Sequence, residues 1–120
     1  MANILIVDDS QTQVANLTKI LEPAGHALSV AENGEEGIAK AIAEQTDLIL
    51  MEVVMPGLNG FQATRKLTRD PATKDIPVIL VSTKDQETDR IWGMRQGARG
   101  YLVKPPDPAE LLGLIDELLG

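Results

Sequence analysis

The distribution of apolar and polar residues along the chain predicts strands and helices in regular alternation. Short apolar runs are typical of strands buried in a sheet, whereas apolar residues three and four positions apart mark one face of a helix. The predicted strands cover residues 3–7, 26–31, 47–51, 78–81 and 101–103. The first two predicted helices start after the caps Ser10 and Asn33, and the third runs from about residue 61 to before Pro71. The last two cover residues 86–96 and 109–119.

Two of the predicted helix starts carry capping residues. Ser10 followed by Gln13, and Asn33 followed by Glu36, have the spacing of a capping box. In that motif the two side chains bind backbone N–H groups that the first helical turn leaves free. The spacing therefore fixes where these helices begin.

Apolar positions within the helices predict which faces are buried. Ile38, Ala41 and Ile42 lie at helical spacing and predict the buried edge of the second helix. The sole tryptophan, Trp92, is expected to pack in the core rather than to anchor a partner. Gly93 beside it weakens the fourth helix by about 1 kcal/mol relative to alanine, so this helix is expected to be the least rigid.

Alternation of strands and helices with short connections predicts an α/β fold. Such a chain forms a parallel sheet with right-handed crossovers and helices on both faces. We expect a doubly wound (βα)5 domain, and if its five parallel strands have the flavodoxin-like order 2-1-3-4-5, strands one and three flank the switch point of the sheet. No repeat or linker interrupts the pattern, so residues 1–120 are expected to form a single domain.

Composition restricts the possible functions. The chain has 43% hydrophobic and 24% charged residues, as globular proteins do, and it has no cysteine for a disulfide or a thiolate site. No apolar run is long enough to span a bilayer, and the N-terminus lacks the pattern of a secretory signal. A cytoplasmic location without membrane contact is therefore expected.

The formal net charge of −7 argues against nucleic acid as a partner, because nucleic-acid binders carry a basic patch or stripe. The closest basic cluster consists of Arg65, Lys66 and Arg69. We interpret this cluster as the solvated face of the third helix.

Polar side chains follow four of the predicted strands at the point where each strand ends: Asp8 and Asp9, Glu52, Ser82 and Thr83, and Lys104. In a parallel sheet these ends lie on one edge, and with the order 2-1-3-4-5 the carboxylates face each other at the switch point. Three converging carboxylates repel one another unless a cation lies among them, and Mg²⁺ prefers oxygen ligands. Lys104 and Ser82 would complete a cradle for a phosphoryl group.

Three motifs in this order resemble the receiver domain of two-component response regulators. They are Val7-Asp8-Asp9-Ser10, the segment 55–60 (Met-Pro-Gly-Leu-Asn-Gly) and the segment 100–105 (Gly-Tyr-Leu-Val-Lys-Pro), and the resemblance covers the whole chain. A single receiver domain is similar to the chemotaxis regulators. The segments 59–65 and 84–89 look similar to regulators of type IV pilus twitching motility.

The resemblance implies a role for each matching position at the predicted site. Asp8 and Asp9 would form the acidic pocket, with Asp9 the more direct Mg²⁺ ligand, and Val54 would offer its backbone carbonyl to the metal. Lys104 would pair with the phosphoryl oxygens, and its bond to Pro105 would be cis.

The resemblance also implies switching residues and partners. Ser82 would move toward the phosphoryl group, and the rotamer of Tyr101 would report activation. Thr83 stands where the family prefers a small residue, so it would narrow access to the site or compete with Ser82. The phosphodonor would be a sensor histidine kinase. A downstream protein would bind the face formed by the fourth helix, fifth strand and fifth helix. The protein itself would be a monomer or weak dimer and would have no enzyme activity.

Glu52 departs from the family pattern, in which the phosphate acceptor is an aspartate. The additional methylene moves the carboxylate outward, so Glu52 could accept hydrogen bonds from Lys104 or Ser82 and imitate the phosphorylated state. Glu52 would also be a further ligand of the metal. It could equally crowd the metal and weaken its binding, because Mg²⁺ tolerates little geometric error. Ordinary phosphorylation is therefore not expected, whether the glutamate is natural or an introduced phosphomimetic.

Two other functions are compatible with the same residues. A small flavodoxin-like enzyme could use two acids and a lysine for metal-dependent phosphoryl transfer, or bind a cofactor. The chain lacks a glycine-rich phosphate loop, and only 2% of its residues are aromatic, which leaves little to stack on a flavin. A pure interaction module with a vestigial acidic pocket is the other alternative, in which Asp8 and Asp9 merely favour the start of a helix.

Overall fold

Five parallel strands form one sheet in the computed structural model, which describes residues 2–120. Each strand is followed by a helix, as the sequence predicts. The elements are β1 (Asn3–Val7), α1 (Gln11–Leu21), β2 (Ala27–Ala31), α2 (Gly34–Ala43), β3 (Leu48–Met51), α3 (Gly60–Arg69), β4 (Val78–Ser82), α4 (Glu87–Arg95), β5 (Gly100–Val103) and α5 (Pro108–Leu119).

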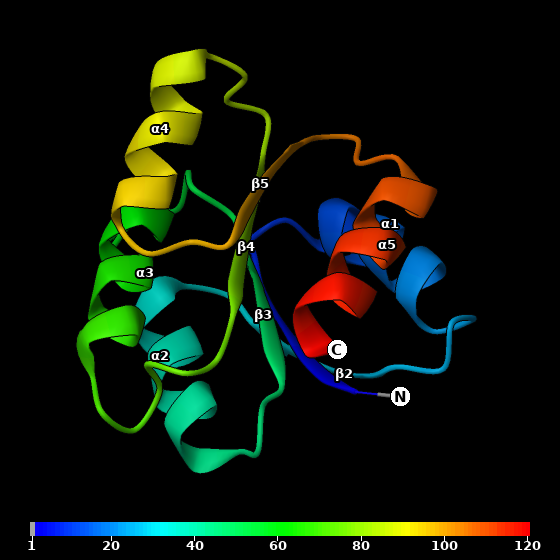
Figure 1. Ribbon diagram of the computed structural model, residues 1–120, viewed down its shortest axis with the longest axis horizontal. Helices are drawn as coiled ribbons and strands as arrows, with labels where there is room; N and C mark the ends of the chain where they lie inside the picture. Colours follow the sequence, from blue (N-terminus) through cyan, green and yellow to red (C-terminus); the bar gives the residue numbers. More distant parts are fainter. Residues whose placement is uncertain (1) are drawn as a thin grey trace.

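The strand order is β2-β1-β3-β4-β5, which confirms the prediction. Helices α1 and α5 cover one face of the sheet, and α2, α3 and α4 cover the other (Figure 1). All neighbouring strands run parallel, so their carboxyl ends lie on the same edge. None of the helices within residues 2–120 is long and apolar enough to cross a membrane.

The central strands are buried on both faces because their alternate residues enter different layers. Leu5 and Val7 of β1 pack with α2 and α3, whereas Ile4 and Ile6 pack with α1 and α5. All four residues of β3 are at most 1% exposed. Continuous apolar runs are therefore required here, and the first polar residue after each strand emerges at the carboxyl edge.

Two predicted core residues lie at the surface. Ile42 is 52% exposed and Trp92 is 49% exposed, so both predictions are wrong. The helices that carry them contact the sheet layer through smaller residues instead: the buried positions are Gly34, Gly37 and Ala41 in α2, and Gly93 in α4. A helix that packs through small residues approaches closely and leaves its large neighbours outside.

Gly93 determines how closely α4 approaches the sheet. A Cβ atom at this position would lie 2.5 Å from Leu80 Cδ1 and 3.3 Å from Tyr101 Cδ2. Leu80 is fully buried, so it has little room to move. The glycine that lowers the helix propensity of α4 is therefore required by its packing.

Replacing Gly93 with alanine is expected to lower the free energy of unfolding by about 1 kcal/mol. Overpacking of a core costs about 1–3 kcal/mol, and the better helix propensity of alanine returns about 1 kcal/mol. Urea denaturation measures the difference. Gly113→Ala in α5 is the control, because no atom lies within 4 Å of the added Cβ. It is expected to stabilise by about 0.5–1 kcal/mol, and equal stabilisation by both substitutions would contradict the packing argument.

Candidate functional site

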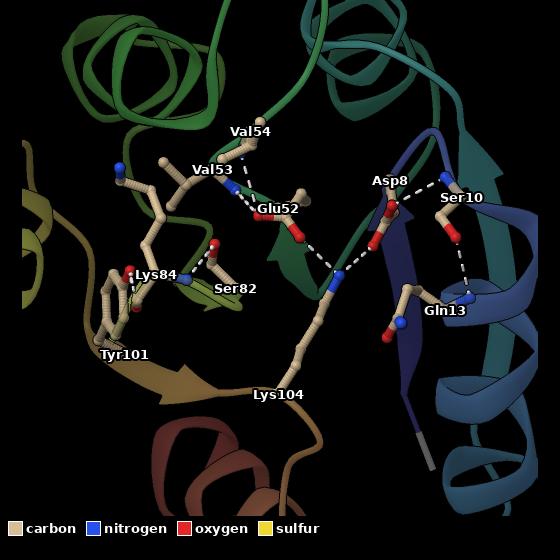
Figure 2. Close-up of polar contacts among 10 residues, drawn as sticks. All are labelled: Asp8, Ser10, Gln13, Glu52, Val53, Val54, Ser82, Lys84, Tyr101 and Lys104. Atoms are coloured by element: carbon tan, nitrogen blue, oxygen red, sulfur yellow. Dashed lines mark hydrogen bonds and ion pairs between the residues drawn. The ribbon is translucent and has the colours of Figure 1, made fainter. Parts of the chain in front are cut away.

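Three charged side chains from the ends of separate strands meet in one buried cluster. Lys104 Nζ lies 2.6 Å from Asp8 Oδ2 and 2.6 Å from Glu52 Oε1 (Figure 2). The side chains are 3% exposed for Asp8, 8% for Glu52 and 4% for Lys104. We call this arrangement the Asp8–Lys104–Glu52 bridge.

Backbone hydrogen bonds at the carboxyl edge of the sheet place the three residues. The N–H group of Asp8 donates to the carbonyl of the last residue of β2 at 3.0 Å, and that of Glu52 donates to the last residue of β1 at 2.9 Å. The N–H group of Lys104 donates to the last residue of β4 at 2.9 Å. Each residue thus extends its strand by one position before the loop begins.

The other carboxylate oxygen of Glu52 binds the loop that follows β3. Glu52 Oε2 accepts the N–H groups of Val53 at 2.6 Å and Val54 at 3.0 Å. Gly60, the first residue of α3, packs directly on this segment, because a Cβ at Gly60 would collide with the backbone carbonyl oxygen of Glu52. Both oxygens of Glu52 are therefore bound by donors of the protein itself.

The other carboxylate oxygen of Asp8 binds the start of α1. Asp8 Oδ1 accepts the N–H group of Ser10 at 2.9 Å, and Ser10 Oγ accepts the N–H group of Gln13 at 3.3 Å. The predicted capping box is therefore wrong in one half, because Asp8 and not the Gln13 side chain binds the N–H of the cap residue. The start of α1 is thereby connected to the bridge.

Glu52 is ionised although it is buried. Burial alone raises the pKa of Glu52, because it disfavours the charged carboxylate. The side chains of Lys104 and Ser82, the N–H group of Val54 and the charge of Lys104 together outweigh burial and lower the pKa below its ordinary value of 4.5. At neutral pH the bridge thus holds two carboxylates against one ammonium group.

Ser82, the last residue of β4, lies beside Glu52, and both Ser82 and Tyr101 bind the backbone of Lys84. Ser82 is fully buried, and its Oγ accepts the N–H group of Lys84 at 3.2 Å. Tyr101 Oη donates to the Lys84 carbonyl at 2.7 Å (Figure 2). The Tyr101 ring is partly buried against the core. Burial, to which the charge of Asp89 adds, raises the pKa of Tyr101 and keeps it protonated as a donor. Thr83 is exposed.

Asp9 takes no part in the bridge that joins the other two acids to Lys104. Asp9 is exposed, and it lines a hollow of about 200 Å³ together with Asp8 and Glu32. Within residues 2–120 no three acidic, histidine or cysteine side chains are placed to hold a metal ion together. The donor types of Asp8, Asp9 and the Val54 carbonyl fit Mg²⁺. The ammonium group of Lys104, however, already binds Asp8 Oδ2, and the N–H group of Ser10 binds Asp8 Oδ1.

Sequence reasoning missed two residues at this edge. Glu32 directly follows β2, so the rule that strand ends meet at one edge also applies to it. Lys84 contributes both of its backbone groups to Ser82 and Tyr101, which side-chain chemistry alone does not indicate. The Lys104–Pro105 peptide bond is cis and follows β5 directly.

The chain matches the sequence model of the response regulator receiver domain over residues 4–116. It is 60% identical over 119 residues to the protein PilH of Pseudomonas aeruginosa, and the alignment covers 99% of this chain and 98% of PilH. Other curated relatives are longer: the chain is 39% identical to the response regulator PleD of Caulobacter vibrioides but spans only 26% of it.

Solved structures with similar folds include two informative ones. The chemotaxis protein CheY4 of Vibrio cholerae superimposes with a TM-score of 0.90 at 32% identity, covering 99% of both chains. The receiver domain of a sensor histidine kinase from Pseudomonas aeruginosa superimposes with a TM-score of 0.91 at 26% identity, covering 99% of this chain and 98% of that one. That receiver was crystallised with a magnesium ion coordinated in its active site cleft.

Replacing Lys104 with alanine is expected to lower the free energy of unfolding by about 3–5 kcal/mol at neutral pH. The substitution leaves two buried carboxylates without their cation, and breaking a buried pair on one side is costly. Chemical denaturation measures the loss. Lys84→Ala is the control: its ammonium lies 3.8 Å from Asp89 and is 42% exposed, so it is expected to cost less than about 1 kcal/mol. Equal losses in the two variants would show that the bridge has no special energetic role.

Proposed function

Because this chain belongs to the family of response regulator receiver domains, we propose that it is a two-component signalling switch whose state is set by Glu52 without phosphorylation. The observation that carries the proposal is the Asp8–Lys104–Glu52 bridge. The output is movement of the cell, by twitching motility or chemotaxis. The 60% identity to PilH and the structural similarity to the chemotaxis protein CheY4 support this output.

The Glu52 carboxylate accepts hydrogen bonds from the same donors that would bind the oxygens of a phosphoryl group at this position. One of its oxygens accepts from Lys104, and the other accepts from the N–H groups of Val53 and Val54. Charge-assisted donors of this kind are the ones that hold a phosphoryl group. The glutamate therefore acts as a phosphomimetic, and the same occupancy makes it a poor phosphate acceptor.

A bound Mg²⁺ would be held by Asp8, Asp9 and the backbone carbonyl of Val54, and it would screen the negative charge of the pocket. The donor types of these groups, and the magnesium ion in the related receiver, support this assignment. Lys104 occupies one of the two Asp8 oxygens and would compete with the metal for it, and Glu52 keeps Lys104 in place. Mg²⁺ binding is therefore weak while Glu52 is present.

The proposed partners are a sensor histidine kinase and a downstream protein that reads the α4–β5–α5 face in the cytoplasm. Large apolar side chains are exposed on two of these elements: Ile91, Trp92 and Met94 are 44%, 49% and 39% exposed on α4, and Val103 is 44% exposed on β5. Exposed apolar patches of this kind are typical of protein interfaces. Trp92 thus becomes a candidate anchor for the partner.

A metal-dependent phosphoryl-transfer enzyme or a cofactor binder is the alternative, and it has less support. Every carboxylate oxygen of the bridge already accepts a hydrogen bond from within the protein, and no glycine-rich phosphate loop precedes a helix. A pure interaction module with a vestigial pocket is the remaining alternative, and Mg²⁺ binding distinguishes it from a receiver.

Replacing Glu52 with aspartate is expected to restore phosphorylation. The shorter side chain withdraws its carboxylate from Lys104 and from the N–H groups, which are then free to bind a phosphoryl group. After incubation with acetyl phosphate and Mg²⁺, intact-mass analysis should show one phosphoryl adduct on Glu52→Asp and none on the parent protein. Glu52→Gln is the control that removes the acceptor charge. A stoichiometric adduct on the parent protein at Glu52, or an inert Glu52→Asp protein, would overturn the proposal.

The same substitution is expected to tighten Mg²⁺ binding at least about tenfold, because Lys104, once Glu52 no longer holds it, can move away from the Asp8 oxygen that it binds. Amide NMR shifts at Asp8, Asp9 and Val54 during a Mg²⁺ titration measure the affinity. Asp9→Asn in the Glu52→Asp background should abolish the shifts. Absence of shifts in both Glu52→Asp and the parent protein would favour the interaction module.

A further inference from the structure

The groove between α2 and α3 concentrates positive charge in an acidic protein. These helices lie side by side on one face of the sheet (Figure 1). Arg65, Lys66 and Arg69 of α3 are all exposed and line a groove of about 700 Å³. The chain as a whole has a formal net charge of −7, so the local charge is opposite to the general one.

These three cations have no acidic partner within the part of the chain that the structure describes. The salt bridges of residues 2–120 involve other lysines and arginines. Asp70 also lines the groove, but its Oδ1 accepts the N–H group of Ala72. The groove therefore holds three positive charges against the one negative charge of Asp70, and no salt bridge among the described residues engages the three cations.

Helix stability alone does not explain the cluster. Cations near the carboxyl end of α3 interact favourably with the helix dipole, which accounts for Lys66 and Arg69 in the last turn. Arg65 lies before that turn and four residues from Arg69, a spacing at which like charges repel each other on a helix. If the cluster were only a solvated helix face, no contact would compensate the repulsion between Arg65 and Arg69.

Apolar side chains lie beside the cations. Ile38 of α2 and Leu58 of the loop before α3 are partly buried and line the same groove. Ile42 lies one turn beyond Ile38 on the same side of α2 and is 52% exposed. The groove thus combines an apolar floor with a basic rim.

We propose that the α2–α3 groove, defined by Ile38, Leu58, Arg65, Lys66 and Arg69, binds an acidic segment of a partner protein that inserts one apolar side chain. Carboxylates of the segment pair with the basic rim, and its apolar side chain covers the floor. The rest of the protein repels an acidic partner, so charge complementarity directs the segment to this groove. Nucleic acid fits less well, because its many phosphates would face the negative charge of the remaining surface.

This docking site is independent of the proposed state of Glu52. No residue that lines the groove belongs to the Asp8–Lys104–Glu52 bridge. The site is also separate from the exposed apolar residues of α4 and β5. The protein can therefore hold one partner at each surface, and failure of either proposal leaves the other intact.

The experiment titrates a synthetic peptide of glutamates around one central leucine into the isotope-labelled full chain and follows amide NMR shifts. The test variant is R65E/K66E/R69E, and R65Q/K66Q/R69Q serves if charge reversal unfolds the helix. The matched control is K19E/R95E/R99E, which changes the net charge equally at three exposed cations outside the groove. Two further probes are the peptide with serine in place of leucine and a short single-stranded DNA.

We expect shifts confined to α2, α3 and the loop before α3. The groove variant should weaken peptide binding at least about tenfold, whereas the matched control should weaken it less than about twofold. The serine peptide should bind more weakly than the leucine peptide. Shifts spread over other faces, or equal weakening by both variants, would overturn the proposal. Tighter binding of DNA than of peptide at the same residues would also overturn it, because the ligand would then be nucleic acid.

Discussion

One buried ammonium group shared by two carboxylates is the interaction on which the functional edge of this protein depends. Charges of this kind are costly to remove from water, so each needs several partners in the folded state. Lys104 supplies one contact to Asp8 and one to Glu52. Backbone N–H groups of Ser10, Val53 and Val54 bind the remaining carboxylate oxygens. The excess negative charge is thus compensated by the loops that follow β1 and β3.

This interaction constrains the connections of the sheet. Asp8 and Glu52 follow the neighbouring strands β1 and β3, whereas Lys104 follows β5, which is separated from β3 by β4. Adjacent strands are about 4.8 Å apart, so a short side chain after β5 would not reach the acids. The long stem of lysine spans this distance and ends between the two carboxylates. The glutamate shortens the remaining gap, because its carboxylate extends further than that of an aspartate.

The way in which the helices pack on the sheet determines which apolar side chains are exposed at the surface. Helices that contact the sheet through small residues lie close to it and expose their large apolar side chains. Gly93 does this in α4, where Trp92 is exposed, and Ala41 does it in α2, where Ile42 is exposed. Two surface regions differ in chemistry. The region of α4 and β5 exposes apolar side chains, whereas the α2–α3 groove carries three cations. Two surfaces of different chemistry suit two different partners.

The sequence by itself determined the elements, their order and the polar residues at the strand ends, because periodicity, caps and strand ends are local properties. Alternating strands and helices leave few topologies, so the strand order 2-1-3-4-5 was also predictable. Only the tertiary structure decided that Asp8 turns inward while Asp9 stays exposed, that one lysine is shared, and that Trp92 faces outward. These outcomes depend on distances between elements far apart in the chain, which a local pattern of residues does not contain.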